Sequence, residues 1–169
     1  MKTRDSQFAG AELYAEDFAV WTARTAELLR ARRFADVDIE HVAEEIEDRG
    51  KSEKRELQSR LTILIAYLLK WEKQPNKRTT SWRSTINTQR VELSRLFRQS
   101  PSLKSNLADT LKEIYPDSIE AAAVETGVLV ADFPDACPHS TGQIIDRAFL
   151  PDPREPARKR RAVCDSLEV

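Results

Sequence analysis

The chain has 169 residues, of which 40% are hydrophobic and 33% are charged, and only four are glycine. This length suits one domain with a sizeable core, and the composition is typical of a soluble and largely helical protein. The formal net charge is −1. No overall field therefore draws the molecule to nucleic acid or to a membrane, and such a partner would need a local charged patch.

The cysteines and the apolar segments exclude several classes of protein. Cys137 and Cys164 form no Cys-x-x-Cys or Cys/His cluster, which argues against zinc and thioredoxin-type sites and favours reduced thiols in the cytosol. Residues 1–10 lack the apolar segment of a signal peptide. The longest apolar run, residues 61–69, is far shorter than the ~20 residues of a membrane span. We therefore expect a cytoplasmic protein with no membrane contact.

The first two helices follow from apolar periodicity. Over residues 11–33, apolar side chains recur at spacings of three and four, which makes one helical face. Residues 38–82 form the central run of the chain, and a long helix over residues 38–73 keeps its apolar residues on one face until Pro75 ends it. Gly50 costs roughly 1 kcal/mol against alanine inside a helix, so a break there stays open, although we favour one continuous helix.

The following helices are marked by their caps and prolines. A third helix is expected from an N-cap at Ser81 to residue 99, and the pair at residues 100–101 signals a restart. Pro116 must kink or split the next element, because proline has no N–H for the helical ladder. A helical piece then ends at Gly127.

The end of the chain is less regular. Residues 128–138 read as a loop bounded by prolines, and Ser140 or Thr141 caps a short helix that reaches about Phe149. Residues 152–169 contain further prolines, the basic run 158–161 and no apolar period, which is typical of a disordered tail.

Together these elements predict an all-α fold. We expect an antiparallel helical bundle of about five to six helices around one long central helix. Residues 1–151 are expected to form a single all-α domain, and residues 152–169 a flexible basic tail.

A series of short motifs resembles a known family. In order along the chain they are Ala43-Glu44-Glu45-Ile46-Glu47-Asp48, Leu68-Leu69-Lys70-Trp71, Gln74-Pro75, Ser81-Trp82-Arg83, Thr85-Ile86, Gln89-Arg90, Ser100-Pro101-Ser102-Leu103, Glu125-Thr126-Gly127, Phe133-Pro134, Cys137-Pro138 and Phe149-Leu150-Pro151. Over residues 14–151 the chain is similar to the bacterial domain-of-unknown-function family twenty-nine. The resemblance implies an all-α cytoplasmic protein of bacteria and implies no activity. Pro116 and His139 depart from the family pattern.

The acidic start of the long helix is one candidate site. His41, Glu45 and Asp48 fall at i, i+4 and i+7 and so project from one helical face, with Glu44 beside them. Such a group could hold a divalent metal, as in helical-bundle metal sites, and would suit a metal-dependent hydrolase. No second acidic doublet of the kind found in all-α nucleotide pyrophosphohydrolases is present. We favour the alternative, a solvated face whose acids suit the positive end of the helix dipole, and expect no cofactor.

The basic segment 70–98 is the second candidate. It carries eight bases and two acids, a net charge of +6. Trp71 and Trp82 lie within it, and cations mixed with aromatic rings are used to bind single strands. The candidate nucleic-acid-binding residues are Lys77, Arg78, Arg83 and Arg90. The alternative is that the tryptophans belong to the core and that this segment faces the acidic segment 38–56, of net charge −4, within the chain or across a dimer.

The leading hypothesis is a small helical structural or interaction module. Its partner is an unidentified protein or a second copy of the chain, since a narrow heptad-like stripe on a long helix favours self-association. A nucleic-acid-binding protein that uses segment 70–98 is one alternative, and a metal-dependent hydrolase on the acidic helix is another. Cys137 and His139 lack an acidic orienting partner in an evident motif, so we expect a structural thiol rather than a nucleophile. An enzyme is the less favoured class.

Overall fold

The computed structural model describes residues 11–152, which form helices and connecting loops with no strand among them. The predicted all-α fold is confirmed. The chain divides into two compact units, one ending at Ser52 and the other beginning at Glu53, and each is described by itself. The expectation of a single domain over residues 1–151 stays a prediction. The predicted tail, apart from Asp152, lies outside the described residues.

The first unit contains α2 (Phe18–Arg30), the short 3-10 helix η1 (Phe34–Asp36) and the beginning of α3 (Ile39–Lys73). The helix expected over residues 11–33 is interrupted at Asp17, which has an extended backbone and caps α2 by accepting a hydrogen bond from the Val20 N–H at 3.0 Å. Aspartate competes for backbone N–H groups in this way and so favours helix starts over helix interiors.

The long helix predicted at the centre of the chain is present and unbroken. α3 continues through Gly50 and passes from the first unit into the second. It ends before Gln74, whose backbone is not helical, because the ring of Pro75 disfavours the helical conformation of the residue before it.

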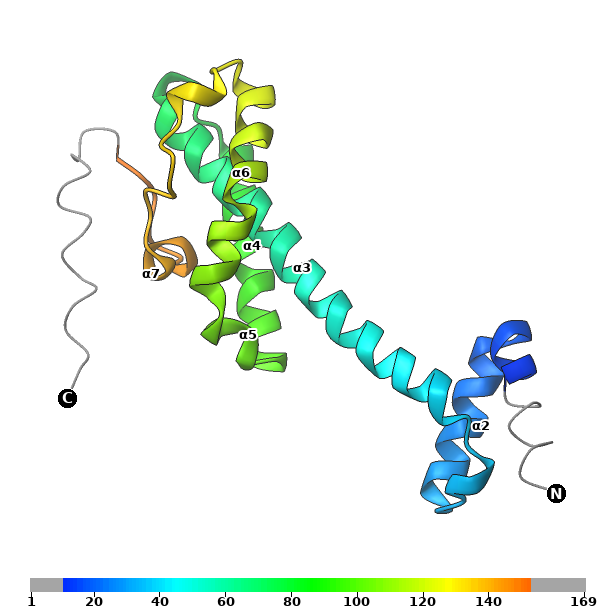
Figure 1. Ribbon diagram of the computed structural model, residues 1–169. Coiled ribbons are helices and arrows are strands. Elements are labelled where there is room, and N and C mark those ends of the chain that lie inside the picture. Colours follow the sequence, from blue (N-terminus) through cyan, green and yellow to red (C-terminus); the bar gives the residue numbers. More distant parts are fainter. Residues whose placement is uncertain (1–10, 153–169) are drawn as a thin grey trace. The chain divides into compact units, whose positions relative to one another are not determined.

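The second unit is a bundle in which the later part of α3, then α4 (Thr80–Gln99), then α6 (Leu107–Thr126) run antiparallel in turn (Figure 1). Apolar side chains from all three helices form its core. They include Leu61, Leu64, Leu68, Ile86, Leu93, Leu111 and Ile114. The short helix α7 (Thr141–Ile145) adds Ile144, which is fully buried.

Local capping accounts for the shorter elements. Thr79 rather than Ser81 caps α4, accepting a hydrogen bond from the Trp82 N–H at 3.2 Å. The 3-10 helix η2 (Pro75–Lys77) precedes it, and α5 (Ser102–Ser105) follows it as the predicted restart. A further 3-10 helix, η3 (Val130–Asp132), leads to α7, where Ser140 forms a capping box with Gln143.

Of the kink or split expected at Pro116, the split does not occur: α6 continues through this residue. Proline leaves the carbonyl of Lys112 without its helical hydrogen bond, and because Lys112 and Pro116 are exposed this carbonyl can be solvated. Ile114 and Tyr115 before the proline, and Ser118 and Ile119 after it, are buried. The Ser118 hydroxyl also donates to the Ile114 carbonyl at 2.9 Å. Packing of the buried face therefore offsets the lost bond. α6 ends at Gly127, in the left-handed conformation with φ of 73°, as predicted.

Two glycines should respond in opposite ways to alanine. A Cβ atom at Gly50 would meet no atom within 4 Å, so Gly50→Ala should stabilise the protein by about 0.5–1 kcal/mol. Gly127 has a φ of +73°, so Gly127→Ala should cost about 1–2 kcal/mol. Thermal unfolding followed by circular dichroism would measure both changes. Destabilisation by Gly50→Ala would show that α3 needs glycine at this point.

Candidate functional site

The basic residues predicted to bind nucleic acid fall into two groups, and Arg90 belongs to the buried one. It is only 3% exposed, and its guanidinium donates hydrogen bonds to three backbone carbonyls, those of Ile144 at 2.8 Å, Phe149 at 2.7 Å and Gln143 at 3.3 Å. Burial lowers the pKa of Arg90 below its ordinary value, although the charge of Asp146 opposes this shift. Arg90 therefore holds the segment around α7 against α4.

Arg78 also forms hydrogen bonds within the fold. Its Nε donates to the Trp71 carbonyl at 2.9 Å and its Nη2 to the Pro151 carbonyl at 3.4 Å, and the guanidinium lies 5.0 Å from the centroid of the Trp71 ring. Lys77 and Arg83, in contrast, are exposed. Two of the four predicted residues thus hold backbone segments in place, and the other two face solvent.

Lys70, which the sequence places in the basic segment and in one of the family motifs, is fully buried. Its ammonium pairs with Glu125 of α6 and lies 3.9 Å from the ring centroid of Tyr67 and 4.5 Å from that of Trp82. A buried ammonium is tolerated only with an ionic or hydrogen-bonding partner, and aromatic faces add cation–π attraction. Lys70 therefore links α3, α4 and α6 at one end of the bundle.

Cys137 and His139 form no nucleophilic pair. The Cys137 thiol lies 3.6 Å from the backbone carbonyl of His139, and burial raises the pKa of this thiol. The His139 ring is buried, with Nε2 3.4 Å from a carboxylate oxygen of Glu72. A thiol with a raised pKa is a poor nucleophile at neutral pH. The expected structural role of Cys137 fits this environment.

In the first unit, the predicted metal ligands contact neighbours within the fold. The Nδ1 atom of His41 lies 2.6 Å from a carboxylate oxygen of Asp38, and Glu45 accepts a hydrogen bond from the Tyr14 hydroxyl at 2.7 Å. The Tyr14 ring also lies 4.9 Å from Trp21 and 4.1 Å from His41, measured between ring centroids. These contacts connect α3 with the helical residues that precede it.

The remaining two predicted ligands are exposed, and their charges act on Tyr14. Glu44 is exposed, and Asp48 pairs with Lys51 at 2.9 Å. Within residues 11–152, no three histidine, cysteine, aspartate or glutamate side chains are grouped so as to hold a metal ion. The metal site stays a prediction, and this geometry lends the hydrolase alternative no support.

The first unit also exposes an apolar stripe on α3, which we call the Ile39–Gly50 stripe. It consists of Ile39, Ala43, Ile46 and Gly50, whose spacings of four, three and four residues place them along one helical face. Ile39 is 49% exposed and Ile46 is 68% exposed, and the two small residues are exposed as well. Large and small residues therefore alternate along an exposed face of α3.

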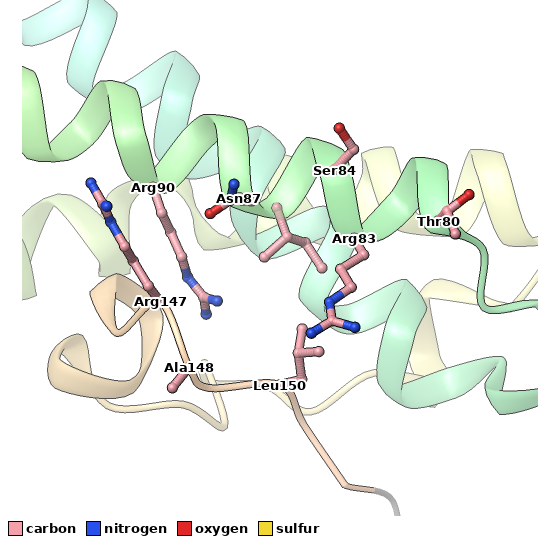
Figure 2. A pocket seen from close by; sticks show the side chains of 9 residues that line it. Thr80, Arg83, Ser84, Asn87, Arg90, Arg147, Ala148 and Leu150 are labelled. Atoms are coloured by element: carbon pink, nitrogen blue, oxygen red, sulfur yellow. The ribbon is translucent and has the colours of Figure 1, made fainter.

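In the second unit, α4 and the segment after α7 form a pocket of about 470 Å³ (Figure 2). Arg83 and Arg90 extend from α4 toward the segment that carries Arg147, Ala148 and Leu150. Neither aspartate nor glutamate lines this pocket. Its chemistry is that of a basic, polar hollow.

A family model, described as a domain of unknown function, DUF29, matches residues 13–150 of the chain. The chain belongs to the DUF29 family. The resemblance inferred from the short motifs is therefore confirmed, and it covers most of the residues described above. No curated protein and no solved structure matches the chain. Over the described part of this DUF29 chain, none of the helices combines the length and apolar character needed to cross a membrane.

Arg90 should contribute far more to the stability of the DUF29 fold than its neighbour Arg83. Arg90→Met leaves three carbonyls without their donor, each worth about 1–3 kcal/mol, so we expect a loss of at least about 3 kcal/mol. Arg83→Met, at an exposed position of the same helix, should change stability by less than about 0.5 kcal/mol. Urea unfolding would measure both, and equal small effects would contradict the role given to Arg90.

The contact between Tyr14 and Glu45 should be visible in a titration. The hydrogen bond to the Glu45 carboxylate raises the pKa of Tyr14 to about 12, with smaller contributions from burial and nearby acids. Because the neutral phenol is the favoured form in the folded state, this contribution to stability is complete below pH 10 and is lost as the pH rises through 12.

Glu45→Gln should lower the pKa of Tyr14 toward its ordinary value. Ultraviolet absorbance of the phenolate, taken as the difference from a Tyr14→Phe variant, would follow this group alone. An unchanged Tyr14 titration in Glu45→Gln would rule out the contact.

Proposed function

We propose that this DUF29 chain is a cytoplasmic interaction module that self-associates through the Ile39–Gly50 stripe. The observation that carries the proposal is the exposure of Ile39 and Ile46, at 49% and 68%, on a regular helix. The cytoplasmic assignment is supported by the free thiol of Cys137, because reduced thiols are usual in that compartment.

The size of the first unit supports a requirement for a partner. Among its described residues, the buried apolar side chains are Trp21, Leu28 and Val37. The unit spans 52 residues, and a unit of this size buries a smaller fraction of its surface than a larger domain does, so its stability is marginal. Residues 11–52 contain no cysteine, and no metal-holding cluster is found in the part of the chain that the structure describes. A partner that covers the exposed apolar side chains of α3 would enlarge this small buried core.

The alternation of large and small residues favours a second copy of the same chain as the partner. In an antiparallel pair of α3 helices, Ile46 of one copy would lie over Ala43 of the other, and Ile39 over Gly50. A twofold axis repeats each of these contacts, as an isologous interface requires. Side chains that insert between smaller ones on a facing helix are also the basis of coiled-coil packing.

The free energy gained by burying these isoleucines predicts a weak dimer. Fully burying an isoleucine gains about 1.5–3 kcal/mol, and the four half-exposed isoleucines of two copies would gain about half of that each. The total, roughly 3–6 kcal/mol, is similar to the lower estimates of the cost of association. We therefore expect a transient, concentration-dependent dimer.

The negative charge of the first unit predicts how self-association depends on salt. Residues 11–52 carry eleven acids and six bases, a net charge of −5, so two first units repel each other. Salt screens such repulsion, with a Debye length of about 10 Å at 0.1 M and 3 Å at 1 M. Self-association should therefore become stronger as salt is added, unlike binding to an oppositely charged partner.

Sedimentation velocity over a range of concentrations would test this proposal. The wild-type mass should rise with concentration, and more so at high salt. Ile46→Gln should weaken association at least tenfold, because it removes an apolar contact from each copy. Gly50→Met should also weaken it by filling the space for Ile39, yet should raise thermal stability because methionine favours the helix more than glycine does.

Val124→Gln is the matched control, since Val124 is 86% exposed on α6 and lies in the other unit. This variant should associate like the wild type. A monomer at every concentration and salt level, or normal association of Gly50→Met, would refute the proposed interface.

A further inference from the structure

Two basic hollows lie along one face of α4, on either side of Arg90 in the helix. The pocket of about 470 Å³ is lined by Arg83 and Asn87 before Arg90. A second hollow of about 310 Å³ is lined by Ser94 and Arg98 after it. Because these residues are spaced by three or four along α4, they share one helical face. Arg90 contributes to both hollows.

The exposed cations of this face have no partner that the described structure supplies. Arg83 and Arg147 line the first hollow, Arg98 and Lys104 line the second, and all four are exposed. None of the four forms an ion pair with another residue in the range 11–152. Their charge is therefore available to a ligand, unlike that of Arg78 and Arg90.

Bases outnumber acids around this face. Neither hollow is lined by aspartate or glutamate. Asp146 lies beside the first hollow, where its charge acts on Arg90 and its carboxylate accepts a hydrogen bond from the Ala148 N–H at 2.9 Å. The acids of the second unit gather elsewhere, with five on α6 against the single base Lys112. Within the second unit, α4 is thus basic and α6 is acidic, so positive charge is concentrated on α4 although the net charge of the unit is close to zero.

The spacing of the cations decides the size of the ligand. Arg83 and Arg98 are 15 residues apart on α4, which corresponds to about 22 Å at 1.5 Å per residue. An inorganic phosphate or a small phosphorylated metabolite cannot reach both ends. A strand of nucleic acid can, because it carries a charge about every 3.4 Å along its axis. Arginine guanidinium groups also match phosphate oxygens with two parallel hydrogen bonds.

We propose that this α4 face, from Arg83 to Arg98 with Lys104 and Arg147 at its edges, binds the phosphodiester backbone of a nucleic acid. The contacts are to phosphates, so binding does not depend on base sequence. Four cations correspond to a slope of roughly −3 in a plot of log affinity against log salt. Lys77 and Arg78, proposed from the sequence, have no part in this surface, and Arg90 serves mainly to hold it in shape.

Fluorescence anisotropy with labelled single-stranded and duplex oligonucleotides and the full chain would test the proposal. Raising salt from about 50 to 200 mM should weaken binding roughly 50-fold. Arg83→Glu/Arg98→Glu should weaken it at least tenfold. Arg55→Glu/Lys112→Glu changes the net charge equally at exposed positions that line neither hollow, and should have little effect. Circular dichroism would show that both double variants keep their helix content.

Several outcomes would overturn the proposal. One is an absence of salt-dependent binding, and another is normal binding by Arg83→Glu/Arg98→Glu, which would place the contact elsewhere in the chain. Equal weakening by the control variant would indicate a general charge effect. Competition by inorganic phosphate or polyglutamate as strong as that by unlabelled oligonucleotide would assign the hollows to a small anion or an acidic protein. Because salt should strengthen self-association, the two proposals can fail separately.

Discussion

The second unit depends on the buried ammonium of Lys70. An unpaired charge in this position would cost several kcal/mol, so the fold has to bring its partners together. Glu125 comes from α6 and Trp82 from α4, while Tyr67 lies one turn before Lys70 on α3 itself. Apolar packing alone would tolerate small shifts of one helix along another. We infer that the charge restricts the three helices to one register at this end of the bundle.

The same unit uses polar side chains to hold its irregular segments. Residues 127–151 contain little regular structure, and buried carbonyls in such a segment need donors. Arg90 supplies three of them, Arg78 donates to Pro151, and the Tyr115 hydroxyl donates to the Pro134 carbonyl at 2.9 Å. The second hollow and the pocket of Figure 2 exist because Arg90 holds the α7 segment at a fixed place along α4.

Apolar spacing, prolines and glycines were enough to predict most of the helices. They identified α3, its end at Pro75 and the end of α6 at Gly127, because these signals act locally on the backbone. The roles of Lys70 and Arg90 were missed, since a charged residue in a basic segment is usually solvated. The sequence did contain an indication of the role of Arg90. Arg90 lies four residues after Ile86 and three before Leu93, and both of these residues are buried. This spacing places Arg90 on the inner face of α4. The interruption at Asp17 was missed because the apolar pattern continues across it.

The proline within α6 has a consequence for how the protein folds. A peptide with proline at its centre forms little helix by itself, so α6 needs the surfaces of α3 and α4 before it is stable. We infer that α3 and α4 pair first and that α6 joins them late. Glu125, the ionic partner of Lys70, belongs to α6. The ammonium of Lys70 must therefore stay hydrated until α6 packs against α3 and α4.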